Sequence, residues 1–366
     1  MRKKILFYFG HPAQYLFARA TIKKLIQNNH EVKITIKTKD VLETLLKNDG
    51  MVYENILQSE RGTSKLSIAF SLLKRVIILL PIILKFKPDF LIGTDATIAQ
   101  LGRLLNIHRV TILEDDYNII KSLAKITYPF TETILCPTVC EVGKWDEKKV
   151  GYDGYMKLGY LHPNVFKFNQ KIVDSYGLKN KYVIIRLAKL TAHHDFGISG
   201  INNILLDRLI DTLEKECLQV IISTESTIDD KYNKYILRIN PNDIHHLLIN
   251  SHLLISDSQS MSVEASVLGV PSLRLSDFAG KISVLEELEN KYDLTFGISP
   301  NDTGKLFSKL TELLSMDDLK NDFMIRRDAM LQDKIDVSSF FTWFLENYPK
   351  SVEIMKKNPE FQYSFK

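Results

Sequence analysis

The chain alternates between two patterns of hydrophobic and polar positions, and each pattern predicts one kind of element. Short apolar runs, continuous or alternating with polar residues, are typical of strands, whereas apolar residues three and four positions apart are typical of helices. Residues 3–9 predict a strand, residues 16–29 a helix and residues 30–38 a second strand. This order is one βαβ unit, in which a helix joins two parallel strands.

The same order continues through the first half of the chain and then starts again. Residues 151–170 are rich in Gly, Tyr, Pro and Asn without a clear period, which indicates a connection between domains. Strands that alternate with helices favour mainly parallel sheets with helices on both faces. The other predicted elements are helices at 39–50, 66–86, 97–106, 203–216, 243–251 and 261–268, and strands at 89–94, 109–114, 133–138, 181–188, 217–224 and 252–256.

The pattern therefore predicts two Rossmann-like α/β domains whose sheets face a central cleft. We expect the first domain over 1–160 and the second over 161–336. Residues 337–366 are aromatic and helical, and we expect them to pack back on the first domain. Ligands of such sheets bind beyond the carboxyl ends of the strands, so functional residues are expected at those ends.

Composition and charge narrow the class of protein. With 45% hydrophobic and 25% charged residues among 366, the sequence is that of an ordinary globular protein. Its net charge of +4 is small for a nucleic-acid binder, so we expect no nucleic-acid partner. Three cysteines, Cys136, Cys140 and Cys217, form neither a disulfide framework nor a zinc motif, which favours a reducing cytoplasm and predicts no metal site.

The most apolar segment, residues 76–84, is too short to span a bilayer and is interrupted by Pro81. The amino terminus likewise has too short an apolar run for a secretory signal. Two interpretations of residues 76–84 remain, a buried helix or a patch that touches the inner face of a membrane. The second interpretation rests on the flanking basic residues Lys74, Arg75, Lys85 and Lys87.

The most informative stretch is residues 252–275, a predicted strand, a turn of small polar residues and a helix. Gly269 and Pro271 end the helix in the usual order. Backbone N–H groups at the start of a helix bind phosphate, and Glu264, one turn further on, could accept hydrogen bonds from a ribose. The alternative is an ordinary capped helix with Glu264 on a solvated face. We expect a diphosphate at the backbone of Ser258, Gln259 and Ser260, and we count Met261 with them among the nucleotide-sugar-binding residues.

The sequence SDSQSMSVEASVLGVPSLRL within this stretch resembles the sugar-nucleotide signature of the GT-B superfamily, particularly that of non-hydrolysing UDP-N-acetylglucosamine 2-epimerases. Gln259 and Ser260 depart from the two glycines of that signature. The chain is also similar to an uncharacterised, glycosyltransferase-like prokaryotic family of the same fold, through GHPAQYLF, YLHPNVF and RLAKLTAHHDFGISG. The residues that match the epimerase signature are Asp257, Ser258, Glu264, Ala265, Leu268, Gly269 and Pro271.

Residues 186–197 follow the first strand of the second domain and form another candidate for ligand contact. Arg186 could neutralise a diphosphate, and His193 or His194 could bind phosphate or transfer a proton. The resemblance implies the same, because a histidine and an arginine of a comparable epimerase loop contact the nucleotide. The alternative is a pair of exposed loop histidines.

Candidate residues in the first domain also follow predicted strands. His11 could contact a sugar or an acceptor, or could cap the next helix. Carboxylates suit proton transfer, and the resemblance matches Asp95 to a catalytic aspartate and one acid of residues 114–116 to a glutamate. Of those we name Glu114 and Asp116 as candidates. The alternative is a charged loop at the mouth of the cleft.

The resemblance implies a cytoplasmic glycosyltransferase that takes a nucleoside-diphosphate sugar, with UDP as the expected nucleotide, and builds a surface glycan or a lipid-linked precursor. Its partners would be the sugar donor and a glycan or lipid-linked acceptor, and it would need no cofactor beyond the donor. Two alternatives stay open. One is a non-hydrolysing UDP-N-acetylhexosamine 2-epimerase, and the other is a non-catalytic protein that binds a nucleotide sugar or a glycan.

Overall fold

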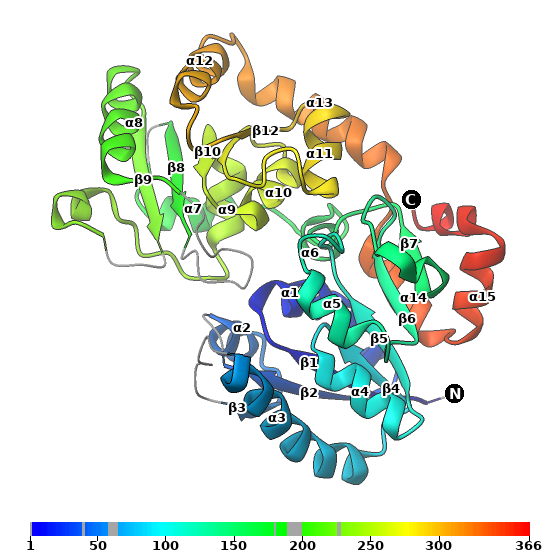
Figure 1. Cartoon of the computed structure of the whole chain (residues 1–366). Coiled ribbons are helices and arrows are strands. Elements are labelled where there is room, and N and C mark those ends of the chain that lie inside the picture. Colours follow the sequence, from blue (N-terminus) through cyan, green and yellow to red (C-terminus); the bar gives the residue numbers. More distant parts are fainter. Residues whose placement is uncertain (1, 39–40, 58–64, 179–180, 189–199, 225–227) are drawn as a thin grey trace. The chain divides into compact units, whose positions relative to one another are not determined.

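The computed structural model describes residues 2–38, 41–57, 65–178, 181–188, 200–224 and 228–366. The chain forms two compact units (Figure 1). Unit 1 comprises residues 1–165 and 334–366, and unit 2 comprises residues 166–333. The boundaries expected at 160 and 336 lie within five residues of these, and residues 337–366 belong to unit 1.

Unit 1 is built on a parallel sheet in the order β3-β2-β1-β4-β5-β6-β7. β1 lies between β2 and β4, so the order of the strands reverses beside β1. The strands are β1 (Lys4–Phe9), β2 (Glu31–Lys37), β3 (Tyr53–Leu57), β4 (Phe90–Gly93), β5 (His108–Ile112), β6 (Thr133–Pro137) and β7 (Lys149–Tyr152). β3 and β7 were not predicted from the sequence.

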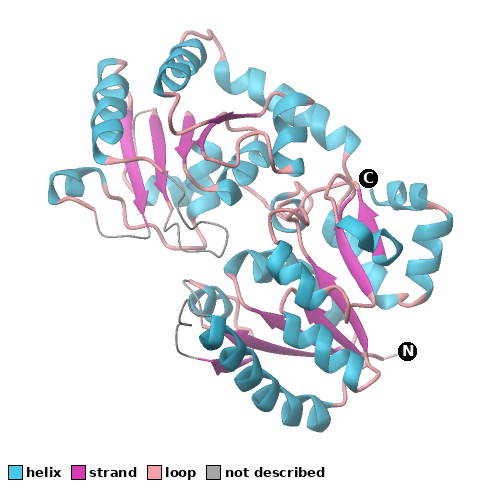
Figure 2. Ribbon diagram, viewed as in Figure 1, coloured by secondary structure: helices cyan, strands magenta, loops and turns pink. Residues whose placement is uncertain are grey.

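Helices cover both faces of this sheet (Figure 2). One group contains α1, α6 and α14, which pack together, and the other contains α3, α4 and α5. The helical segments of unit 1 are α1 (Pro12–Gln27), α2 (Leu42–Asn48), α3 (Lys65–Phe86), α4 (Ala96–Leu104), α5 (Lys121–Thr127), η1 (Gly143–Lys148), α6 (Leu158–Leu161), α14 (Val337–Glu346), α15 (Lys350–Lys357) and η3 (Pro359–Phe365). None of the described helices is long and apolar enough to cross a bilayer.

Unit 2 has a parallel sheet in the order β12-β11-β10-β8-β9. The order reverses beside β8, its first strand. The strands are β8 (Tyr182–Leu187), β9 (Gln219–Thr224), β10 (Leu253–Ser256), β11 (Ser272–Leu275) and β12 (Thr295–Ile298). The helical segments are α7 (Gln170–Ser175), α8 (Asn203–Lys215), η2 (Asp230–Tyr235), α9 (Ile244–Asn250), α10 (Gln259–Leu268), α11 (Ser283–Asn290), α12 (Thr303–Leu314) and α13 (Leu319–Asp333). Two parallel α/β sheets confirm the predicted fold class.

The carboxyl-terminal segment joins the core of unit 1 through α14. The Phe341 ring stacks on Phe17 of α1 with ring centroids 5.0 Å apart, and both side chains are buried. Lys3, immediately before β1, donates from Nζ to the carbonyl oxygens of Leu345 and Tyr348, each at 3.1 Å. These contacts tie the last part of the sequence to the first strand.

Truncation of Phe341 should destabilise unit 1. Phe341→Ala removes a fully buried ring, so we expect the free energy of unfolding to fall by about 3–5 kcal/mol. Both tryptophans, Trp145 and Trp343, belong to unit 1, so their fluorescence during urea denaturation reports on this unit. Leu104→Ala is the control, since Leu104 is 73% exposed, and it should change the free energy by less than about 0.5 kcal/mol. Equal losses in the two variants would contradict the packing described for α14.

Candidate functional site

The turn from β10 into α10 is closed by hydrogen bonds within the turn. The Ser258 hydroxyl caps the helix by accepting from the Met261 N–H at 3.4 Å, and the Ser258 N–H donates to Ser256 Oγ at 2.8 Å. The helix begins at Gln259, two residues before the start predicted from the sequence. The N–H groups of Gln259 and Ser260 are its first two and have no acceptor within the helix. They point out of the positive end of the helix dipole, which favours an anion.

The side chain of Gln259, which stands where the resembling signature has a glycine, is held against β11. Its Oε1 accepts from Arg274 Nη1 at 2.8 Å, and its Nε2 donates to Ser276 Oγ. Because the amide is fixed by these two partners, it does not occupy the N–H groups that begin α10. The glutamine that replaces the glycine therefore does not itself block the start of the helix.

Arg274 is a positively charged residue that the sequence analysis did not single out. Its side chain is fully buried on β11, and its Nη2 lies 3.8 Å from Glu289 Oε2. Burial lowers the pKa of Arg274, and the nearby carboxylates of Glu289 and Glu286 oppose that shift. The sequence did contain a signal for this residue, because Arg274 interrupts the apolar run 270–275. An arginine in a buried strand is rarely without a charged or polar partner.

Glu264 faces α9 rather than solvent. Its Oε1 lies 3.5 Å from His245 Nε2, and the two side chains are 12% and 7% exposed. The alternative that placed Glu264 on a solvated face is therefore wrong. The carboxylate lies one turn along α10 from the open N–H groups, where the sequence analysis expected a ribose ligand.

Asp257 fixes both ends of the segment that contains His193 and His194. Its carboxylate accepts from the N–H of Ala188 at 2.6 Å and from the N–H of Ile201 at 3.3 Å. The predictions for His193 and His194 lie outside the described residues. Burial raises the pKa of Asp257, although the backbone N–H groups and the charge of Arg186 oppose the shift.

Arg186 belongs to the same edge of the unit 2 sheet. Its carbonyl oxygen accepts from the Asp257 N–H at 3.3 Å, and its Nη1 donates to Ser223 Oγ at 2.8 Å. β8 and β10 are neighbours, with Arg186 beside Ser256 in the register. Arg186 and the start of α10 are thus brought together where the strand order reverses, which is the usual ligand position in such sheets.

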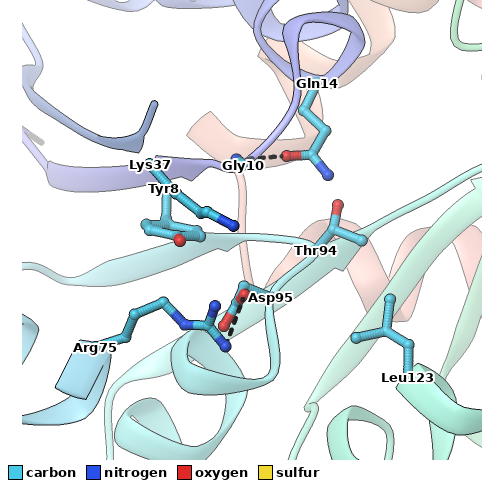
Figure 3. Close-up of a pocket in the computed structure, with 8 residues that line it drawn as sticks. All are labelled: Tyr8, Gly10, Gln14, Lys37, Arg75, Thr94, Asp95 and Leu123. Carbon is cyan, nitrogen blue, oxygen red and sulfur yellow. Dashed lines mark hydrogen bonds and ion pairs between the residues drawn. The ribbon is translucent and has the colours of Figure 1, made fainter. Parts of the chain in front are cut away.

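Unit 1 has a pocket of about 190 Å³ at the corresponding place, beside β1 and β4 (Figure 3). Figure 3 shows the side chains of Lys37, Arg75 and Asp95 pointing into one region from three different elements. β4 ends at Gly93, where a Cβ atom would lie 2.8 Å from the Tyr8 carbonyl oxygen, so a glycine is needed there. The pocket is lined by Tyr8, Gly10, Gln14, Lys37, Arg75, Thr94, Asp95 and Leu123.

Asp95 is the predicted catalytic residue that lines this pocket. Its Oδ1 caps α4 by accepting from the Thr97 N–H at 2.9 Å, and its Oδ2 lies 3.6 Å from Arg75 Nη2. Arg75 is only 4% exposed, so it does not belong to a basic surface beside residues 76–84, as one interpretation of the sequence had it. The helical spacing of α3 directs Arg75 toward the sheet and Lys74 toward solvent.

His11 caps α1, which is the structural alternative that the sequence analysis left open. Its Nδ1 accepts from the Ala13 N–H at 3.2 Å, and the following Pro12 occupies the first turn of the helix. In this arrangement the ring proton sits on Nε2. Nε2 of His11 can therefore donate a hydrogen bond to a ligand. It cannot accept a proton, because it already carries one.

The acids at 114–116 do not line the pocket. Glu114 accepts from Lys157 Nζ at 2.5 Å and from the Met156 N–H at 2.6 Å, and its side chain is 11% exposed. Asp116 is 4% exposed and accepts from the Glu141 N–H at 2.8 Å. Both acids therefore have structural partners. They do not form the charged loop at the mouth of a cleft that the alternative assumed.

Among the described residues, no group of three or more His, Cys, Asp or Glu side chains is placed to hold a metal ion. Cys136 and Cys140 are buried, and burial raises the pKa of the Cys136 thiol to about 12. At neutral pH that thiol is protonated and is a poor metal ligand or nucleophile.

The chain matches one family model and shares its fold with several solved structures. The family model described as "Protein of unknown function (DUF354)" matches residues 10–295. No curated protein sequence matches. Among solved structures, the UDP-GlcNAc 2-epimerase from Neisseria meningitidis bound to UDP-GlcNAc is 15% identical with a TM-score of 0.70, covering 94% of this chain and 100% of that one. Similarity at this identity establishes the fold.

Two further structures share the architecture. The S. aureus MnaA-UDP co-structure is 16% identical with a TM-score of 0.68, covering 95% of this chain and 97% of that chain. The spinosyn forosaminyltransferase SpnP is 14% identical with a TM-score of 0.60, covering 96% and 100%. The fold is thus the GT-B-like fold shared by nucleotide-sugar epimerases and glycosyltransferases.

Asp257 should make stability depend on pH. Because burial raises its pKa, the folded protein keeps the proton to a higher pH than the unfolded chain, so stability falls as pH rises from near 3.8, the ordinary value. In Asp257→Asn this titration is absent. We expect the difference in free energy of unfolding, wild type minus Asp257→Asn, to decrease as pH rises through this window in urea titrations. A flat difference for Asp257→Asn would contradict the assignment.

Proposed function

The chain belongs to the family described as "Protein of unknown function (DUF354)", and we propose that it is a glycosyltransferase that uses a nucleoside-diphosphate sugar, with UDP as the nucleotide. The observation that carries this proposal is the start of α10. Two backbone N–H groups at a helix N-terminus, those of Gln259 and Ser260, have no acceptor among the described residues, and a carboxylate, Glu264, lies one turn away. Phosphate and ribose are the two ligand groups that this pair would recognise.

The donor would be held by residues of unit 2. The diphosphate accepts hydrogen bonds from the N–H groups of Gln259 and Ser260, and Arg186 contributes positive charge from the end of β8. Glu264 accepts hydrogen bonds from the ribose hydroxyls. Two of the similar structures are described as complexes with UDP and with UDP-GlcNAc, which supports a uridine nucleotide as the first ligand to test.

The acceptor would bind at the pocket of unit 1. Its hydroxyl oxygen attacks the anomeric carbon of the donor sugar, and the bond from that carbon to the diphosphate oxygen breaks. The hydroxyl proton passes to the Asp95 carboxylate, and the electron pair of the broken bond leaves with UDP. Of the predicted acids Asp95 is best placed for this role, because it lines the pocket while Glu114 and Asp116 are bonded elsewhere.

The acceptor of this proposal is glycan or lipid-linked, and α3 supplies the surface that would approach a membrane. Leu73, Ile77 and Leu84 on this helix are 55%, 62% and 54% exposed, and with the exposed Pro81 they form one stripe at helical spacing. We call these four residues the α3 stripe. α3 contains no acidic residue, and the exposed Lys74, Lys85 and Lys87 flank the stripe. An apolar face bordered by lysines suits an anionic membrane surface.

A second candidate function is a 2-epimerase that acts on a UDP-N-acetylhexosamine. The observation that favours it is the similarity to solved epimerases over nearly the whole chain. An epimerase would convert UDP-GlcNAc with no acceptor present, whereas a transferase needs the acceptor. Proton NMR of UDP-GlcNAc incubated with the protein alone separates the two. Binding without any turnover would leave the third function, that of a non-catalytic binding protein.

Substitution of Glu264 should weaken nucleotide binding. Glu264→Gln replaces the charged acceptor of the ribose hydroxyls by a neutral amide. A hydrogen bond to a charged group is worth about 1.5–3 kcal/mol, so we expect the dissociation constant for UDP to rise about 10- to 100-fold in isothermal titration calorimetry. Uracil alone, which has no ribose, should not discriminate between the proteins.

The matched control is Glu216→Gln, an identical chemical change at an exposed position that follows α8. This variant should bind UDP as the wild type does. If neither UDP nor any other nucleoside diphosphate binds to the wild type, the proposed donor site at α10 is wrong. If UDP binds equally to wild type and Glu264→Gln, the glutamate does not hold the ribose.

A charge in the α3 stripe should weaken membrane binding. Burial of an isoleucine side chain is worth about 1.5–3 kcal/mol, so Ile77→Asp should lower the partition onto vesicles containing phosphatidylglycerol by about tenfold or more in a sedimentation assay. Ile325→Asp on α13 introduces the same charge at a position that is 61% exposed in unit 2, and it should bind like the wild type. Failure of the wild-type protein to sediment with these vesicles would exclude the proposed contact.

A further inference from the structure

Arg274 is a fully buried charge on β11 that no step of the proposed reaction uses. In the sheet register it lies beside Ser256 of β10 and Gly297 of β12. Its Nη1 donates to Gln259 Oε1 at 2.8 Å, and its Nη2 lies 3.8 Å from Glu289 Oε2. An arginine in the core costs free energy, which these two partners offset.

The neighbouring strand and helix leave room for the guanidinium. A Cβ atom at Gly297 would lie 2.6 Å from Arg274 Nη2, so a larger residue there would displace the side chain. The Gly297 N–H donates at 2.9 Å to Glu289 Oε2, the same oxygen that approaches Arg274. Arg274 is thus held on one side by a carboxylate that is anchored to β12, and on the other side by the Gln259 amide.

Gln259 connects this buried group to the start of α10. It is the first residue of that helix, and its Nε2 donates to the hydroxyl of Ser276, the residue that follows β11. Ser276 Oγ also accepts from the Phe278 N–H at 3.0 Å, so the loop after β11 fixes this hydroxyl. The Gln259 amide therefore ties the first turn of α10 to two separate points, one on β11 and one just beyond it.

We propose that Arg274 and Gln259 are positioning residues that hold the start of α10 in the geometry that binds the diphosphate. This inference rests on the proposed function, because the diphosphate is the ligand assigned there to the N–H groups of this helix. Neither side chain has to contact the donor, since Arg274 is fully buried and the Gln259 amide bonds within the protein. Hydrogen-bond donors that are fixed before the ligand arrives need no reorganisation when it binds. A glycine at position 259 could not form this anchor.

The test compares the binding of UDP and uridine, with UDP measured by isothermal titration calorimetry and uridine by displacement of UDP. Gln259→Met keeps the length of the side chain and removes both hydrogen bonds of the amide. We expect the dissociation constant for UDP to rise about three- to tenfold, the effect of losing one ordinary hydrogen bond. Uridine has no phosphate and should bind both proteins equally. A merely structural role would lower the melting temperature and leave the ratio of the two affinities unchanged.

The matched control is Gln332→Met, the same chemical change at an exposed position of α13 in unit 2. This variant should bind UDP and uridine as the wild type does. Arg274→Met removes the charged partner of the Gln259 amide and should weaken UDP binding in the same way. The variant with both substitutions should bind UDP no more weakly than the weaker of the two single variants, because two residues that act as one anchor are not additive.

The outcomes separate this proposal from the proposed function. Equal UDP affinity of Gln259→Met and wild type, or an equal loss of UDP and uridine affinity, would overturn the positioning role and leave the donor site standing. Additive losses in the double variant would overturn the joint role of the two residues. Should Arg274→Met fail to fold in a thermal melt, Gln259→Met alone decides. A wild type that does not bind UDP would refute the donor site, and the positioning role with it.

Discussion

The parallel pairing of the strands is the constraint on which both candidate sites depend. Parallel strands pair only when their carboxyl ends meet at one edge of the sheet, and each strand is followed by the amino terminus of a helix. In unit 1 the register of β1 with β4 sets Tyr8 beside Gly93, so Asp95 and the start of α4 follow directly beside Tyr8. In unit 2 the pairing of β8 with β10 sets Arg186 beside Ser256, just before α10.

The buried charges differ in how far their hydrogen-bonding capacity is used within the described residues. Glu114 is nearly buried, but its two oxygens accept from Lys157 and from a backbone N–H. Asp257 likewise accepts from two backbone N–H groups. Arg75 is just as deeply buried and makes no hydrogen bond within the described residues. A buried charge costs free energy unless it is both paired and hydrogen-bonded. The carboxylates meet both conditions, whereas Arg75 has an ion pair with Asp95 but no hydrogen bond within the described residues.

Parts of the fold and of the site could be predicted because their signals are local. The strand over 3–9, the helix that ends at Gly269 and the βαβ order follow from the period of apolar residues and from helix-ending residues. β7 was missed because it has four residues, one of them Gly151, and lies in a stretch without periodicity. The sequence analysis grouped Arg75 with its neighbour Lys74 on a basic surface. Adjacent residues of a helix point in different directions, and which of them is buried depends on what α3 packs against. The outcome for Glu264, on α10 but turned toward His245, has the same cause.

The sequence by itself determined the fold class, the alternation of strands and helices over most of the chain, and the turn at 256–260 that leads into a helix. These features depend on residues close together along the chain, whose spacing fixes their backbone conformation. Only the tertiary structure decided that the Gln259 amide is held by Arg274 and Ser276, and that Arg75, Lys37 and Tyr8 line one pocket. Those partners lie far apart in the sequence. Their meeting depends on which strands pair and which helix faces the sheet, and no local pattern contains that information.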